Sequence, residues 1–223
     1  MKLLLVGYGR MGRMVEELAR DEGVEIAGRI DVDNVSGEWP AADVAVDFST
    51  AAAVHANVSR LAARGTSVVI GTTGWSAREA ELRAVAEAAG IGVVASANFS
   101  IGVNVFQLIA AEAGRLMAGH DEYGAWIHEA HHAAKLDAPS GTALLLRDAV
   151  RNAGLGRPID ISSTRAGTIP GTHTIGFDSA SDTIELTHTA RDRRGFARGA
   201  LLAAKWVAGR RGWYSMADVL TGR

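Results

Sequence analysis

The chain of 223 residues contains no cysteine, which excludes disulfide bonds, thiolate nucleophiles and cysteine-ligated metals. An excess of charge of one sign is also lacking. Lys and Arg number 23 against 25 Asp and Glu, and no basic cluster stands out, so we predict no nucleic-acid partner. Long apolar runs are absent as well: residues 3–6 meet glycine too soon for a signal-peptide core, and no run approaches a membrane span. We therefore expect a cytoplasmic protein with no membrane partner.

What the chain does contain is ordinary for a globular protein. Hydrophobic residues make up 48% and charged residues 22%, so a sizeable core can be buried. The length suits one large domain or two small ones.

The N-terminal residues have the sequence form of a dinucleotide-binding unit. A short apolar run, Leu3–Val6, predicts a buried strand and leads at once into the glycine-rich stretch Gly7–Gly12 and then a helix. In such a turn the first glycine permits the bend, the second lets the backbone approach a pyrophosphate, and the third lets helix pack on strand. A second strand, Ile26–Ile30, ends at Asp31, where an acid would hydrogen-bond the ribose 2′-OH. This context favours a nucleotide site over a merely structural turn.

Strands and helices continue to alternate up to about residue 99. We predict strands at Val44–Phe48, Val68–Ile70 and Val93–Val94. A helix runs to Arg64 with Gly65 as its left-handed C-cap, and Ser76 with Glu79 fits a capping box for a helix through Ala89. The pattern predicts a doubly wound, Rossmann-like parallel sheet with its ligand beyond the carboxyl ends of the strands. The segments expected at that edge are Gly7–Gly12, Asp31, Gly71–Gly74 and Ser96–Phe99.

After Phe99 the pattern changes to that of a smaller α+β domain with an antiparallel-rich mixed sheet. We expect a long apolar helix to Met117 and a last helix, about 196–208, that returns to the first domain. The predicted domains are residues 1–99 with 195–223, and residues 100–194. The expected strands of the second domain are about 123–128, Thr172–Phe177 and Thr183–His188.

One segment, Glu129–Thr142, gathers two histidines, a lysine and a helix start. Pro139 stops any helix from running through, and Ser140 is a predicted N-cap. Free backbone N–H groups at the positive end of the following helix would hold an anion such as a carboxylate. The segment therefore predicts a site for a small acidic molecule that is protonated as it reacts. The N–H groups in question belong to Gly141, Thr142 and Ala143.

This segment resembles the signature of the 4-hydroxy-tetrahydrodipicolinate reductase family, from the diaminopimelate route to lysine. Further family-like motifs follow in the family's order over almost the whole chain. They are Gly9–Gly12, Gly71–Gly74, Ala97–Asn104, Arg165–Gly167 and Gly171–Thr174.

The resemblance implies an NAD(P)H-dependent oxidoreductase that reduces a small dicarboxylate imine. It also implies a homotetramer built by the mixed-sheet domain, which serves substrate binding and oligomerisation, and no metal. By resemblance His131 is the proton donor or acceptor and Lys135 the proton donor, while His132, Gly141 and Thr142 contact substrate. The residues that the resemblance assigns to the nicotinamide cofactor are Gly7, Tyr8, Gly9, Arg10, Met11, Gly12, Asp31, Gly71, Thr72, Thr73, Ser96, Ala97, Asn98 and Phe99.

Two features depart from the family pattern. The chain is short for the family, and the shortening falls between Asp31 and Asp47. Val32 also follows Asp31 where many members carry a basic residue that can meet a 2′-phosphate. An acid without an adjacent cation favours NADH over NADPH. Arg10, Arg13 or Arg29 could nevertheless supply the missing cation.

Two other functions compete with a reductase. Residues 128–132 match the H-E-x-x-H pattern of zinc metalloproteases, but that motif needs a helix and the alternation around Trp126 favours a strand. A nucleotide-sensing or scaffold protein could keep the dinucleotide fold, but it would have no reason to keep His131, His132 and Lys135 together.

Overall fold

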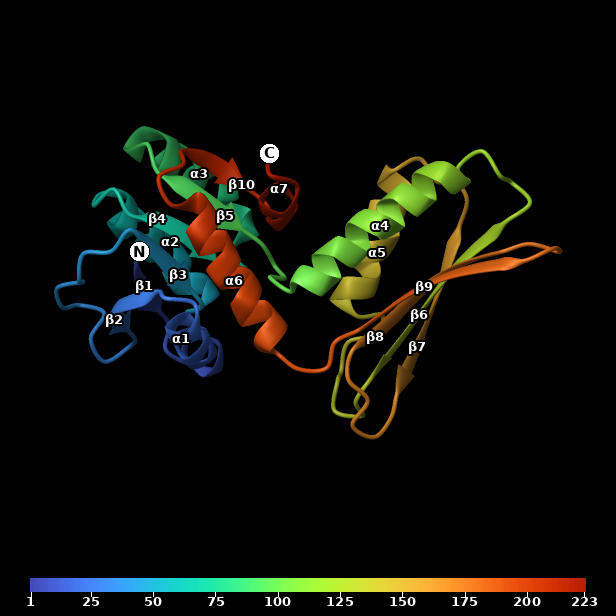
Figure 1. The fold of residues 1–223 in the computed structure, drawn as a ribbon, viewed down its shortest axis with the longest axis horizontal. Coiled ribbons are helices and arrows are strands. Elements are labelled where there is room, and N and C mark those ends of the chain that lie inside the picture. The colour runs from blue at the N-terminus through green and yellow to red at the C-terminus, as the bar shows by residue number, and fades with distance from the viewer. The chain divides into compact units, whose positions relative to one another are not determined.

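The computed structural model describes all residues, 1–223, and divides into two compact units (Figure 1). Unit 1 comprises Met1–Ile101 and Arg194–Arg223, and unit 2 comprises Gly102–Arg193. The last long helix, α6 (Arg194–Val207), belongs to unit 1. No helix is both long enough and apolar enough to cross a membrane.

Unit 1 is built on a six-stranded sheet in the order β10-β5-β4-β3-β1-β2, and every pair of neighbouring strands is parallel. The predicted doubly wound parallel sheet is confirmed. Its last strand and the helix after it, α7, were not predicted, because a three-residue strand and a six-residue helix give too little periodicity. The strands are β1 (Lys2–Val6), β2 (Glu25–Ile30), β3 (Val44–Asp47), β4 (Ser67–Ile70), β5 (Gly92–Ala95) and β10 (Gly212–Tyr214).

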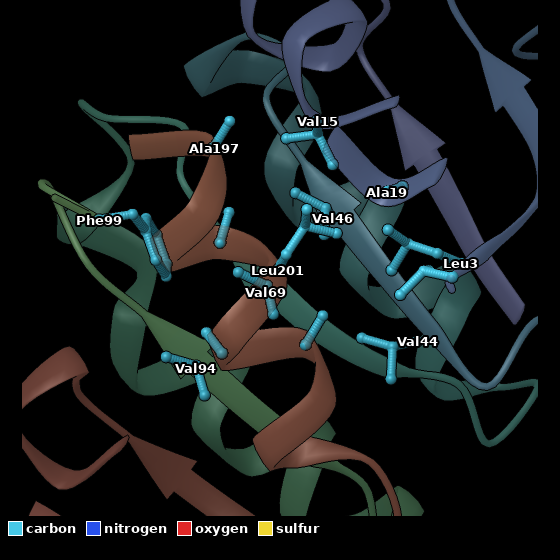
Figure 2. Close-up of a cluster of buried hydrophobic side chains, with 14 of the residues drawn as sticks. Leu3, Val15, Ala19, Val44, Val46, Val69, Val94, Phe99, Ala197 and Leu201 are labelled. Atoms are coloured by element: carbon cyan, nitrogen blue, oxygen red, sulfur yellow. The ribbon is translucent and has the colours of Figure 1, made fainter. Parts of the chain in front are cut away.

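The two faces of this sheet carry separate cores, because successive side chains of a strand point to opposite sides. On one face Leu3 and Leu5 join a cluster with helices α1 and α6, which Figure 2 shows around Val46, Val69 and Leu201. On the other face Leu4 and Val6 pack in a second cluster with α2 and α3. Helices on both faces leave the carboxyl edge of the sheet free for a ligand. The helices of unit 1, besides α6, are α1 (Arg10–Asp21), α2 (Ala51–Ala62), α3 (Glu79–Ala89) and α7 (Met216–Thr221).

The ends of two helices test the expected caps. Gly65 has a φ of 68°, so its predicted left-handed conformation is confirmed, although α2 ends before Arg64. The predicted capping box of Ser76 and Glu79 is wrong. Ser76 opens a 3₁₀ turn, η1 (Ser76–Arg78), and the N-cap of α3 makes no side-chain hydrogen bond. The Glu79 carboxylate instead binds Arg83, one turn along the helix, at 2.7 Å.

No helix connects β2 to β3. The chain crosses over β1 through residues 31–43, which form turns and irregular backbone. Trp39 fills the space on the sheet face where a crossover helix would otherwise pack, and is 1% exposed. Pro40 also lies close to β2, where a side chain at Gly28 would come within 2.7 Å of the proline ring.

Unit 2 contains a four-stranded mixed sheet in the order β7-β6-β8-β9. β6 is parallel to β7 and antiparallel to β8, which is antiparallel to β9. The predicted mixed sheet is confirmed. Strand β7 was not predicted, because its sequence is largely polar at an edge of the sheet. The strands are β6 (Gly124–His131), β7 (Ile159–Arg165), β8 (Thr172–Asp178) and β9 (Thr183–Thr189).

Helices α4 (Ile101–Met117) and α5 (Gly141–Asn152) cover one face of this sheet (Figure 1). Phe106 of α4 and Leu146 of α5 pack there against Ile127 and other apolar residues of the strands. The opposite face carries polar side chains that pair across strands, such as His128 with Ser162 at 2.9 Å and Thr174 with Thr187 at 2.9 Å.

Candidate functional site

The glycine-rich turn of unit 1 is shaped by close packing at two of its glycines. Gly7 has a φ of +87°, and a Cβ there would lie 2.5 Å from the carbonyl of Phe48. A Cβ on Gly12 would lie 2.4 Å from the Gly7 carbonyl oxygen, so neither position accepts a side chain. Gly9 has nothing within 4 Å on its Cβ side. The turn is thus packed on the protein side and open where a ligand would approach.

Helix α1 begins directly after this turn, and no side chain caps its N-cap residue Gly9. The first turn of the helix also carries no acidic residue. The first N–H groups of a helix have no intrahelical partner, and together with the helix dipole they attract an anion. The uncapped helix start and the open side of Gly9 therefore fit the pyrophosphate of a dinucleotide.

Two cavities lie at this edge of unit 1, with volumes of about 320 and 360 Å³. They share Gly9, Phe48, Ser49 and Thr50 in their walls, which places them next to each other. The first holds Asp31 and the apolar residues Val32 and Val35, and the second holds the start of α1 and the loop after β4.

Most residues predicted to contact the cofactor line these cavities, and some do not. As cofactor contacts they stay predictions. Phe99 is 2% exposed and belongs to the core (Figure 2), and Gly12 serves the turn itself. The predicted residues in the walls are Gly7, Tyr8, Gly9, Arg10, Met11, Asp31, Gly71, Thr72 and Thr73, whereas Gly12, Ser96, Ala97, Asn98 and Phe99 are absent from them.

Sequence reasoning missed a group of residues around the end of β3, and Asp47, the last residue of that strand, is its centre. Its side chain is fully buried and accepts hydrogen bonds from the Ser49 hydroxyl at 2.7 Å, the Asn57 amide at 2.9 Å and the Thr72 hydroxyl at 2.8 Å. All three donors belong to residues of the cavity walls. One buried carboxylate thus positions three segments of the cleft. An acid at the end of a buried strand was the only signal in the sequence that could have pointed to it.

The cations near Asp31 do not all remain available for a 2′-phosphate. Arg29 is bound by Glu16, to which its Nε donates at 2.8 Å, and the Tyr8 hydroxyl donates to the same carboxylate. The Arg29 hydrogen bond and then that of Tyr8 lower the pKa of Glu16 to about 2. The residue after Asp31, Val32, is 81% exposed and offers no charge.

In unit 2 the strand register brings together residues that are far apart in the sequence. Parallel pairing sets His131 of β6 beside Arg165 of β7, and antiparallel pairing sets Glu129 beside His173 of β8. Glu129 is 0% exposed, and both of its oxygens are bound by Arg165, at 2.6 and 2.9 Å. It also accepts the N–H of Ser140 at 3.2 Å and pairs with Nδ1 of His131.

Burial and charge shift the titration of this cluster. Burial would raise the pKa of Glu129, but hydrogen bonds from Arg165, Ser163, His131 and the Ser140 N–H lower it to about 2. Burial lowers the pKa of His131, and the attached Glu129 carboxylate only partly reverses this. Burial and then the His131 charge lower the pKa of His173 to about 4. The two histidines are therefore neutral at neutral pH beside an ionised carboxylate.

The loop after β6 carries the other predicted groups. Nζ of Lys135 lies 2.7 and 2.9 Å from the two carboxylate oxygens of Asp137. The hydrogen bond from Lys135, joined by the N–H groups of Asp137 itself and of Gly141, lowers the pKa of Asp137. His132 is exposed. Lys135 and His131 thus lie in one segment of unit 2, as the sequence indicated.

Helix α5 begins where the sequence placed it. Ser140 is the N-cap, and its hydroxyl accepts the N–H of Ala143 at 3.2 Å, so the predicted cap is confirmed. The same bond corrects the prediction that Ala143 offers a free N–H to an anion. Gly141 and Thr142 remain for that role.

The H-E-x-x-H match does not have the geometry of a zinc protease. His128 lies in β6 and His132 directly after it, so the two are separated by extended backbone rather than one helical turn. Four residues of a strand span about 13 Å, too far for both rings to bind one ion. A different trio, Glu129, His131 and His173, offers donor atoms within 4.8 Å of one another, but Arg165 already binds both Glu129 oxygens.

Unit 1 has a parallel sheet with a glycine-rich turn, and unit 2 has a loop whose His131 and Lys135 side chains can transfer protons. These features define the class of two-unit, pyridine-nucleotide-dependent oxidoreductases. The family model "Dihydrodipicolinate reductase, N-terminus" matches residues 1–99, and its C-terminal counterpart matches residues 102–220. The chain belongs to the dihydrodipicolinate reductase family.

Individual relatives agree with this. The chain is 37% identical over 234 residues to the 4-hydroxy-tetrahydrodipicolinate reductase of Christiangramia forsetii, covering 99% of this chain and 98% of that protein. It is 38% identical over 270 residues to the enzyme of that name from Rhodopseudomonas palustris, covering 99% and 97%. Since this chain has only 223 residues, it is shorter than the second relative, as the sequence analysis expected.

Solved structures agree on the fold. A dipicolinate-bound dihydrodipicolinate reductase from Paenisporosarcina sp. TG-14 superposes with a TM-score of 0.83 at 22% identity, covering 96% of this chain and 97% of that one. An amine dehydrogenase from Mycobacterium smegmatis has a TM-score of 0.63 at 12% identity, covering 98% and 95%. The family predicted from the sequence motifs is confirmed, and with it an oxidoreductase of the lysine and diaminopimelate route.

Proposed function

We propose that this chain carries out the family's reduction of 4-hydroxy-tetrahydrodipicolinate, through its dehydrated cyclic imine, to tetrahydrodipicolinate. The observation that carries the proposal is the segment from Glu129 to Thr142. It holds a partly buried, carboxylate-bound imidazole, a lysine and the start of a helix in one unit. A dicarboxylate that must gain a proton matches those three features.

Lys135 and His131 have the proton-transfer roles. A bound nicotinamide cofactor would supply a hydride to the ring carbon conjugated with the imine; the electron pair then moves toward the ring nitrogen and leaves an enamine-like species that must take up a proton. Lys135 donates that proton from Nζ once the substrate takes the place of Asp137 as its partner. His131 is neutral with Nδ1 bound by Glu129, so its Nε2 stabilises or exchanges the proton.

The substrate carboxylate is held by His132 together with the N–H groups of Gly141 and Thr142. Both N–H groups belong to the first turn of α5, where the helix dipole favours an anion. Asp137 lies close enough to hydrogen-bond the Gly141 N–H and Lys135, so in our view it holds these groups until substrate arrives. Asp137 therefore orients the loop and takes no part in the chemistry.

The cofactor is a pyridine nucleotide held by the predicted first domain, 1–99 with 195–223, and NADH is the preferred form. Asp31 is placed at the cavity wall to bind the ribose hydroxyls, and Val32 beside it cannot meet a 2′-phosphate. Arg29 is bound by Glu16, which removes one of the three arginines that could have met a 2′-phosphate in place of a basic residue at position 32. The other two are Arg10 and Arg13.

The predicted second domain, 100–194, also has a face suited to assembly. One side of its sheet is covered by α4 and α5, while the other presents paired polar side chains and Trp126. That open face supports the predicted homotetramer, and light scattering would report the mass. The absence of nucleic-acid and membrane partners and the cytoplasmic location stay predictions.

The test is NADH oxidation by purified protein with substrate generated in place by the preceding enzyme of the route. A Lys135→Ala variant should lose about 10²–10⁴-fold in kcat, the range that general acid catalysis supplies. Lys2→Ala is the matched control, because Lys2 is an exposed lysine of unit 1 with only a 3.9 Å contact to Glu25. If the folded wild type oxidises neither NADH nor NADPH, the proposed reaction is wrong.

The cofactor preference has its own test. The ratio of kcat/KM for NADH to that for NADPH should exceed one, and Val32→Arg should lower it by adding a cation next to Asp31. Val32 is exposed, so the larger side chain needs no repacking. A wild type that strongly favours NADPH would refute the preference and leave the reaction itself untouched.

A further inference from the structure

A single buried carboxylate organises the candidate catalytic segment of unit 2. Glu129 lies inside the sheet with no exposed surface, and its two oxygens accept hydrogen bonds from four residues. Two bonds come from Arg165, and the others come from the Ser140 N–H, His131 and Ser163. A carboxylate with this many donors stays ionised although it is buried, because each donor favours the charged form.

Arg165 extends the same arrangement to the loop. Its Nη2 donates to the carbonyl oxygen of Asp137 at 2.6 Å, and its Nη1 donates to that of Thr164 at 2.8 Å. The planar guanidinium therefore links β7 to the loop that carries Lys135, while its two terminal nitrogens bind both oxygens of Glu129. The Ser140 N–H, bound by Glu129, fixes the end of that loop at the start of α5.

The contact with His131 decides how that ring is protonated. Glu129 is an acceptor only, so the ring nitrogen facing it, Nδ1, must carry the hydrogen. Nε2 is then left with its lone pair, which makes it the atom able to exchange a proton. The ring also meets His173 edge-on, with centroids 5.1 Å apart.

We propose that Glu129 and Arg165 form a positioning pair that fixes the Nδ1–H tautomer and the orientation of His131 and at the same time anchors the Lys135 loop at Asp137 and Ser140. The proposal rests on the proposed function, since it assigns His131 and Lys135 to the reaction. Glu129 has no exposed surface with which to touch a substrate, so it acts through the residues it holds.

A purely structural ion pair is the competing explanation. Buried pairs of this kind are weak grounds for stability, because desolvation of the two charges offsets much of their attraction. Here the pair has a further geometry that stability alone does not require: it binds the ring of His131 and one backbone group at each end of the 137–140 turn. The two explanations differ in what they predict for the tautomer and the titration of His131 when the pair is broken.

The first experiment uses Glu129→Gln, which keeps the size of the side chain and removes its charge. Nitrogen-15 NMR of the histidine rings, assigned with a His131→Asn variant, reports the tautomer without substrate or cofactor. At neutral pH the wild type should show Nδ1–H for His131, and Glu129→Gln should shift the ring toward Nε2–H. Glu112→Gln is the control, since Glu112 is an exposed carboxylate of the same unit paired only with Arg115.

Kinetics supply the second readout. Glu129→Gln should lower kcat about 100-fold with little change in KM, as expected when a group that orients a catalytic imidazole is lost. The variant should also move the acidic limb of the kcat/KM profile to lower pH, because the negative charge that favours the His131 imidazolium is gone. The other groups around the ring, namely Arg165, His173, Lys135 and Asp137, are unchanged in this variant.

Glu129→Asp keeps the charge and guards against a variant that fails to fold. It should retain the Nδ1–H tautomer and recover part of the lost kcat. The inference is overturned if Glu129→Gln leaves the tautomer and the pH limb unchanged, even when stability and kcat fall, since that is the behaviour of a structural pair. If Glu129→Gln shifts the tautomer of His131 but the wild type oxidises neither NADH nor NADPH with this substrate, the proposed function fails and the positioning of His131 stands.

Discussion

The crossover from β2 to β3 makes a demanding prediction about stability. A helix usually fills this position in a doubly wound sheet, but here residues 31–43 cross without one and Trp39 is the only large side chain that they bury. Its indole nitrogen donates to the Val35 carbonyl at 3.0 Å, and the Arg60 guanidinium lies 4.6 Å from the ring centroid. Trp39 therefore connects the core of unit 1 to a loop that lines the cofactor cavity through Val35.

The magnitude follows from the buried area. A fully buried tryptophan removes roughly 150–250 Å² from water, worth about 4–6 kcal/mol at 25 cal/mol per Å². Measured losses for large aromatic side chains replaced by alanine in protein cores are about 3–5 kcal/mol. We expect Trp39→Ala to lower the free energy of unfolding of unit 1 by about 4 kcal/mol, a large part of the total stability of a domain.

Urea denaturation followed by circular dichroism measures this loss, and unit 2 supplies an internal reference if its transition is separate. Trp39→Phe is the matched control: it keeps an aromatic ring and loses the bond to the Val35 carbonyl, so it should cost about 1–2 kcal/mol. The dissociation constant for NADH should rise in Trp39→Ala more than in Trp39→Phe, because the loop loses its anchor. A loss of stability below about 1 kcal/mol for Trp39→Ala would refute the view that this side chain replaces a crossover helix.

Three further predictions concern single residues. The pKa of His173 falls from 6.5 in the unfolded chain to about 4 on burial, so the unfolded state binds more protons between these values. The free energy of unfolding should drop by about 3 kcal/mol as the pH falls through that window, and denaturation at several pH values should show a weaker dependence for His173→Gln. Ser140→Ala removes the hydroxyl that accepts the Ala143 N–H and that lies 2.9 Å from His173 Nε2. The free energy of unfolding of unit 2 should fall by about 2–3 kcal/mol in the same assay, and by less in Ser140→Thr. Gly71→Ala places a Cβ 2.1 Å from the ring of Phe48, which lines both cavities. Calorimetry should therefore find weaker NADH binding and a loss of about 1–3 kcal/mol in the free energy of unfolding. Unchanged binding would mean that the Phe48 ring does not define the cleft.

Much of unit 1 was predictable because its signals are local. Each buried parallel strand is a short apolar run, and the glycines at 7 and 12 have conformational and packing requirements that only glycine meets. Ser140 likewise predicted the start of α5, because an N-cap needs only its own side chain and the backbone N–H of the residue three positions later. A local signal was not always sufficient, because Ser76 and Glu79 match a capping box but Ser76 opens a 3₁₀ turn.

The sequence by itself thus determined the Rossmann-like unit and, through its motifs, the family, and it named a candidate catalytic segment. Tertiary structure alone decided which distant residues support them. Arg165 reaches Glu129 only because β7 pairs in parallel with β6, and Asp47 gathers its three donors from three separate segments of the cleft. Strand register and the burial of a charge depend on neighbours far along the chain, so no local pattern encodes them. This is why His131 and Lys135 could be named from the sequence, while the carboxylate and guanidinium that hold them were found only in the fold.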